Sequence, residues 1–128
     1  MARMAVARLA MVSLDCAEPG PLAEFWAGLL DGAVIAATDT VSVTQAGTLM
    51  ISAMQVPGYE PATWPEGAVA KQIHLDLAVR DLEEAEAEAL RLGATKSGHQ
   101  PHPDEWRIML DPAGHPFCLT ANIPFDAG

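Results

Sequence analysis

The sequence predicts an α+β fold in which one unit, a strand followed by a helix and three more strands, occurs twice. Two amphipathic helical segments, each followed closely by glycine, lie in the two halves of the chain. Short strand-like runs separated by turn residues follow each of them. Similar motifs also recur: Met11-Val-Ser-Leu and His74-Leu-Asp-Leu are 63 residues apart, and Gly32-Ala33 and Gly93-Ala94 are 61 apart. These observations indicate a duplicated module.

The first module is expected at about residues 7–57. It begins with a strand at 7–15 and a helix at 19–30, which Gly32 should end by adopting the left-handed conformation. Apolar residues at helical spacing predict the buried face of this helix: Leu22, Phe25, Trp26, Leu29 and Leu30. Strands are expected near 34–38, 41–45 and 49–56.

A segment rich in proline, about residues 58–70, is expected to link the first module to a second at about 71–124. The second module should start with a strand at 72–79. Asp81 and Glu84 form a capping box for a helix at 81–92, whose buried stripe is Leu82, Ala85, Ala89 and Leu92. Strands should follow near 95, 106–110 and 116–122, so we expect residues 1–128 to form a single domain.

Composition and net charge limit the kinds of molecule that the protein is expected to bind. Seventeen acidic residues against seven basic ones give a net charge of −10, which disfavours nucleic acid and anionic membrane surfaces and favours a neutral or cationic ligand. Two cysteines do not form a disulfide framework, so reduced thiols and a cytoplasmic location are expected. No apolar run approaches the length of about 18 residues that a membrane span requires.

Three stretches carry a family resemblance: VSLDCAEPGPLAEFWAGLLDGA, IHLDLAVRDLEEAEAEALRLGA and WRIMLDPAGHPFCL. The sequence resembles the vicinal oxygen chelate superfamily, which includes glyoxalase I, bleomycin resistance proteins and extradiol dioxygenases. It is most similar to the small glyoxalase-like proteins of high-GC bacteria. The resemblance implies that two tandem βαβββ modules form a curled, mixed, incomplete-barrel sheet around a cleft.

The resemblance places the metal-binding positions of the family at Met11, Ile51, His74 and Cys118. The family usually has histidine or glutamate at the first position and glutamate at the last, so only His74 is an ordinary ligand. Zinc sites use at least three histidine, cysteine or carboxylate ligands, and the side chain of isoleucine has no atom that can bind a metal. We therefore predict no metal cofactor; the alternative is a divalent metal completed by Asp76 or Ser13.

Alternation along the strands predicts which residues face the cleft. If His74 does so, Asp76 and Ala78 share its face, whereas Ile73, Leu75, Leu77 and Val79 should pack on the helix. The residues expected to line the cleft are Met11, Ser13, Asp15, Ile51, Trp64, His74, Asp76, Trp106, Cys118 and Thr120. The two tryptophans either stack a planar ligand or anchor the packing.

His74 and Asp76 are the candidate catalytic pair, because a carboxylate can orient an imidazole as a general base. The alternative is structural, with Asp76 only satisfying a half-buried histidine. Cys118 is expected to be a small packing residue. His99 and His102 are expected in an exposed loop, and His115 in a turn.

The leading hypothesis is a small-molecule-binding protein of the glyoxalase and bleomycin resistance type with a degenerate metal site. One alternative is an enzyme: a lyase or dioxygenase with an unusual metal sphere, or a metal-free acid-base catalyst that uses His74, Asp76 and Asp15. Another is a structural or regulatory dimer without a small ligand. The sequence leaves open whether a homodimer forms.

Overall fold

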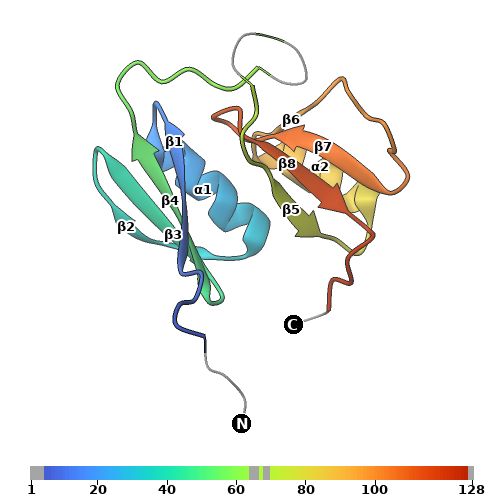
Figure 1. Cartoon of the computed structure of the whole chain (residues 1–128), viewed down its shortest axis with the longest axis horizontal. Coiled ribbons are helices and arrows are strands. Elements are labelled where there is room, and N and C mark those ends of the chain that lie inside the picture. Colours follow the sequence, from blue (N-terminus) through green and yellow to red (C-terminus); the bar gives the residue numbers. More distant parts are fainter. Residues whose placement is uncertain (1–4, 64–66, 68–69, 127–128) are drawn as a thin grey trace.

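The computed structural model describes residues 5–63, 67 and 70–126. Its first half is a four-stranded mixed sheet in the order β1-β4-β3-β2, with one helix (Figure 1). β1 runs parallel to β4, and the other neighbouring strands are antiparallel. The elements are β1 (Met11–Cys16), α1 (Pro19–Leu30), β2 (Ala33–Ala37), β3 (Val41–Ala46) and β4 (Leu49–Gln55).

The second half repeats this arrangement. Its sheet has the order β5-β8-β7-β6, with β5 parallel to β8. The elements are β5 (Leu75–Ala78), α2 (Leu82–Leu92), β6 (Thr95–Lys96), β7 (Trp106–Leu110) and β8 (Pro116–Thr120). The predicted α+β fold of two βαβββ modules is confirmed, and neither sheet closes into a barrel.

The helix ends differ in one detail from the prediction. Asp31, not Gly32, takes the left-handed conformation at the end of α1, with φ of 54°. Gly32 is needed for space, because a Cβ there would lie 2.4 Å from the carbonyl oxygen of Gln45. At α2 the prediction holds: the side chain of Asp81 accepts a hydrogen bond from the backbone N–H of Glu84, and Gly93 ends the helix with φ of 119°.

The two modules share one hydrophobic core. α1 lies on the side of the first sheet that faces the second module (Figure 1). Trp26 in this helix is fully buried and contacts Phe117 of β8 edge to face, with ring centroids 5.2 Å apart. Its indole N–H donates to the carboxylate of Asp111 at 3.1 Å. The helix-facing sides of both sheets are therefore covered, and their other faces point away from the core.

β5 is shorter at its start than the predicted strand, since its first paired residue is Leu75. Ile73 was expected to pack on the helix, but it is 68% exposed because it precedes the first strand pair and is not held by the pleat. Leu75, Leu77 and Val79 do pack against the core. Within the described residues, no helix is long and apolar enough to cross a bilayer.

Candidate functional site

The outer face of the second sheet gathers several of the predicted site residues. Asp76 pairs with Cys118 across β5 and β8, and Trp106 pairs with Thr120 across β7 and β8. Paired residues project to the same side of a sheet, and residues two apart in a strand do so too. We call this surface, with His74 at its edge, the second-sheet face: His74, Asp76, Trp106, Cys118 and Thr120.

Three polar side chains meet on the second-sheet face. The Nε2 atom of His74 is 3.4 Å from a carboxylate oxygen of Asp76. One potential ligand atom from each of His74, Asp76 and Cys118 lies within 4.8 Å of the other two. The side chains of His74 and Asp76 are 36% and 50% exposed, so a molecule from solvent can reach both.

Cys118 in this cluster is a protonated thiol at neutral pH. Burial raises its pKa to about 11, and the negative charge of Asp76 and a hydrogen bond to it act in the same direction. Lys71 opposes the shift but does not cancel it. Such a thiol is a poor nucleophile, because the thiolate is the reactive form.

The far end of the second-sheet face is aromatic. The ring of Trp106 lies against that of His102, with centroids 4.7 Å apart. The hydroxyl of Thr120 accepts a hydrogen bond from the backbone N–H of Asn122 at 3.1 Å, and Thr120 is only 6% exposed. Trp106 therefore offers ring surface on the same sheet face as the cluster, whereas Thr120 supports the turn after β8.

The outer face of the first sheet, here called the first-sheet face, carries other predicted site residues. Met11 pairs with Met50, Ser13 with Ser52, and Asp15 with Met54. The Ser52 hydroxyl donates to that of Ser13 at 2.8 Å. Met11 and Met54 are each 39% exposed, so methionine side chains are open to contact on this face.

Ile51 was expected beside Met11, but the structure places it on the opposite face. The parallel register pairs Ile51 with Val12, and Ile51 belongs to the core with 3% exposure. The neighbouring residues Met50 and Ser52, neither of which was predicted from the sequence, occupy the first-sheet face instead. Ile51 does line, together with Asp76, a mostly apolar hollow of about 460 Å³ between the modules.

The nine predicted cleft residues that the structure describes do not line one cleft within the chain. Met11, Ser13 and Asp15 lie on the first-sheet face, and the cluster around His74 lies on the second-sheet face. Both faces point away from the shared core. Trp64 lies outside the described residues.

The cluster on the second-sheet face has donors of the types that zinc prefers. His74 offers an imidazole nitrogen, Cys118 a thiol sulfur and Asp76 a carboxylate oxygen. Of these three residues, only Asp76 is not at a metal-binding position of the family. Binding there would have to displace the proton of Cys118, whose pKa is raised. Of the other family positions, Met11 offers only a thioether and Ile51 has no donor atom.

Comparisons with known proteins agree with this architecture. A family model described as a glyoxalase-like domain matches residues 11–120. The chain belongs to this glyoxalase-like family. The match and the structural neighbours support the expected place in the vicinal oxygen chelate superfamily. No curated protein matches the sequence.

Several solved structures have the same fold. The fosfomycin resistance protein FosX from Mesorhizobium loti has a TM-score of 0.70 at 15% identity, covering 93% of this chain and 94% of that one. A FosX mutant from Listeria monocytogenes, complexed with Mn(II) and 1S,2S-dihydroxypropylphosphonic acid, has a TM-score of 0.68 at 15% identity, with 93% of each chain covered. A glyoxalase/bleomycin resistance protein/dioxygenase family enzyme from Burkholderia phytofirmans PsJN has a TM-score of 0.66 at 18% identity, covering 88% and 97%.

Proposed function

We propose that the chain binds a small organic molecule at the second-sheet face. The observation that carries the proposal is the solvent-accessible cluster of His74, Asp76 and Cys118. Histidine and a protonated thiol can donate hydrogen bonds, a carboxylate can accept them, and Trp106 adds aromatic area on the same sheet face. A few polar groups beside apolar surface are typical of small-molecule sites.

The ligand we propose is neutral or cationic. The chain carries a net charge of −10, and the carboxylate of Asp76 lies within the cluster itself. An anion would meet repulsion from both. The phosphonic acid in the FosX complex is a ligand of that protein, and the departures at Met11, Ile51 and Cys118 argue against a simple transfer to this chain.

We further propose that the binding cleft is completed in a homodimer. The first-sheet face exposes methionine side chains, and the second-sheet face exposes the polar cluster, yet both point away from the core. A second copy that set its first-sheet face against the second-sheet face would supply the missing wall. This arrangement would bring Met11 and Ser13 close to His74, as expected from the family.

The proposed binding function is tested with a panel of neutral, cationic and anionic organic molecules, including a phosphonate, added to protein in EDTA. Two-dimensional NMR follows the backbone amides. We expect saturable shifts of Asp76 and Cys118 with neutral or cationic members of the panel. If only the phosphonate shifts them, or if no molecule does, the proposal is wrong.

A metal-dependent enzyme, either a lyase or a dioxygenase, is the second candidate. The three donor atoms within 4.8 Å of one another favour it. A bound cation would supply Lewis acidity, and His74, Asp76 and Cys118 would be its ligands on this chain. Without a metal, the contact between Asp76 and His74 could instead support acid-base catalysis, in which the carboxylate orients the imidazole.

Metal analysis separates these candidates. Protein purified without a histidine tag or chelator should contain a stoichiometric metal if the second candidate is right, and His74→Ala and Cys118→Ser should both remove it. His99→Ala is the matched control, because this exposed histidine lies outside the cluster. The binding proposal predicts substoichiometric metal in all four proteins.

A further inference from the structure

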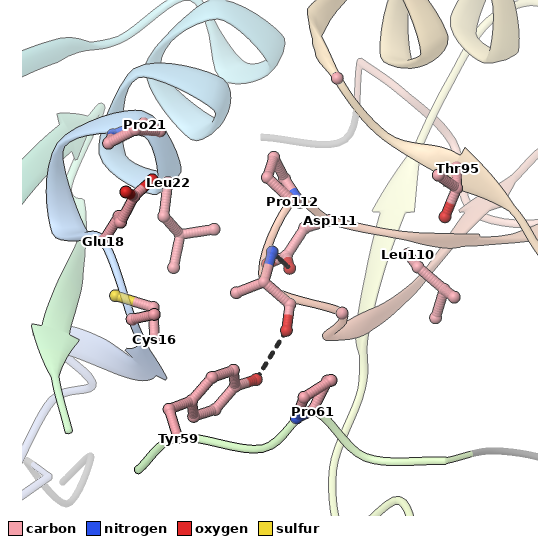
Figure 2. Close-up of a pocket in the computed structure, with 14 residues that line it drawn as sticks. Cys16, Glu18, Pro21, Leu22, Tyr59, Pro61, Thr95, Leu110, Asp111 and Pro112 are labelled. Atoms are coloured by element: carbon pink, nitrogen blue, oxygen red, sulfur yellow. Dashed lines mark hydrogen bonds between the residues drawn. The ribbon is translucent and has the colours of Figure 1, made fainter. Parts of the chain in front are cut away.

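A separate open pocket of about 570 Å³ lies in the seam between the two modules. Figure 2 shows Glu18 and Leu22 on one wall, from the first module, and Leu110 and Asp111 on the other, from the second. Tyr59, from the segment that follows β4, closes one end. The pocket shares no lining residue with the second-sheet face, and its volume is in the range of small-molecule sites.

Hydrogen bonds hold the walls of the pocket in place. The Tyr59 hydroxyl donates to the carbonyl oxygen of Ala113 at 2.7 Å (Figure 2). Burial raises the pKa of Tyr59 to about 12, so the hydroxyl keeps its proton. The buried carboxylate of Asp111 accepts from the indole of Trp26 at 3.1 Å and from the backbone N–H groups of Ala113 and His115, each at 2.9 Å. The pocket is therefore preformed.

The charges around the pocket disfavour anions. Its charged lining residues are the acidic Glu18 and Asp111, and no lysine or arginine is among its lining residues in the described part of the chain. A helix N-terminus normally attracts anions through free N–H groups, but α1 begins with Pro19 and has Pro21 in its first turn. Neither proline has an N–H to donate.

We propose that this seam pocket binds a small organic cation with an apolar body. Glu18 is exposed and its side chain makes no cap to the helix, so its carboxylate can face an ammonium group in the pocket. Pro21 and Leu110 offer apolar contact from the two walls, and the ring of Tyr59 offers an aromatic surface for the cation. The inference is independent of the function proposed for the second-sheet face.

Benzylamine is a suitable probe, with benzoate as its anionic counterpart of similar shape. The indole N–H of Trp26 reports on the seam pocket because it bonds to Asp111, and that of Trp106 reports on the second-sheet face. Replacing Trp64 and Trp106 by phenylalanine in turn assigns the three indole signals. In ¹⁵N NMR titrations in EDTA, we expect benzylamine to shift the Trp26 signal saturably and benzoate to leave it unchanged.

The contribution of the Glu18 charge to benzylamine binding is tested with two variants, one at the start of α1 and one within it. Glu18→Gln should weaken benzylamine binding by about twofold to fivefold, the range for a partly exposed ion pair. Glu24→Gln removes the same charge from an exposed position outside the pocket and should leave the affinity unchanged. Equal effects of the two variants, equal binding of benzoate, or no saturable shift at Trp26 would overturn the proposal. A shift at Trp106 alone would also overturn it, while leaving the function proposed for the second-sheet face intact.

Discussion

At the scale of single residues, the chemistry of Cys118 depends on Asp76. Burial and the neighbouring carboxylate raise the pKa of the thiol to about 11, because both disfavour a thiolate. Asp76→Asn removes the charge and lowers this pKa, and each unit increases the thiolate fraction about tenfold. We expect alkylation of Cys118 by iodoacetamide at pH 8 to become roughly threefold to tenfold faster, as measured by mass spectrometry.

Peptide mapping distinguishes Cys118 from Cys16, which is buried and whose pKa is also raised. Asp104→Asn serves as the control, because it removes an exposed carboxylate outside the cluster. An unchanged rate in Asp76→Asn, or an equal acceleration in the control, would show that Asp76 does not govern the thiol.

At the scale of elements, the cap of α2 is a local contribution to stability. The carboxylate of Asp81 accepts the hydrogen bond of the Glu84 backbone N–H at 3.0 Å. Asp81→Ala should lower the free energy of unfolding by about 1 kcal/mol, measured by urea denaturation. Glu24→Ala, at an exposed position inside α1, should change it by much less. A similar loss in both variants would contradict the capping role.

The sequence predicts a helix or strand well where a periodic pattern of apolar residues is bounded by residues that cap or end the element. α2 starts after Asp81 and ends at Gly93, as the capping box and the glycine indicate. β4 is different, because Leu49–Gln55 has apolar residues on both sides and alternation cannot decide which side faces the core. Only the register with β1 shows that Ile51 is buried and that Met50 and Ser52 lie on the first-sheet face.

At the scale of the whole molecule, Trp26 joins the two modules. Its ring contacts Phe117 and its indole donates to Asp111, both in the second module. Trp26→Phe creates a cavity and leaves a buried carboxylate oxygen without this donor, so the free energy of unfolding should fall by about 2–4 kcal/mol. Trp106→Phe, at a partly exposed position, should cost less than about 1 kcal/mol. If denaturation experiments show that both variants lose the same free energy of unfolding, Trp26 does not join the modules in this way.

The proposed homodimer makes a further prediction at this scale. Met11 is 39% exposed on the first-sheet face, so a charge there should disrupt an interface that uses this face. In sedimentation velocity experiments we expect the wild type to be a dimer and Met11→Lys to be a monomer. Leu90→Lys, at a 43% exposed position on α2, should remain dimeric. A wild type that is monomeric at all concentrations would contradict the proposed homodimer.

The sequence could not show how the modules pack on each other. The stripe that includes Leu22, Phe25 and Trp26 predicts a buried helix face, but burial alone does not reveal which surface covers it. In the structure the second module covers part of this stripe, since Phe25 and Trp26 both contact Phe117. As a result, most of the described residues expected in one cleft lie on two outer faces of the chain, and Ile51 lies in the core. The shared face of Asp76 and Cys118 likewise depends on strand register.

The central claim is that His74 on the second-sheet face binds a small molecule without needing a metal. It is tested most directly by the dissociation constant of the best ligand of the NMR panel, measured by calorimetry in EDTA. We predict that His74→Ala weakens binding by roughly fivefold to 150-fold, the cost of an unmade buried hydrogen bond, while His99→Ala leaves it unchanged. Equal affinity in the wild type and His74→Ala, or binding that appears only after Mn(II) or Zn(II) is added, would contradict the claim.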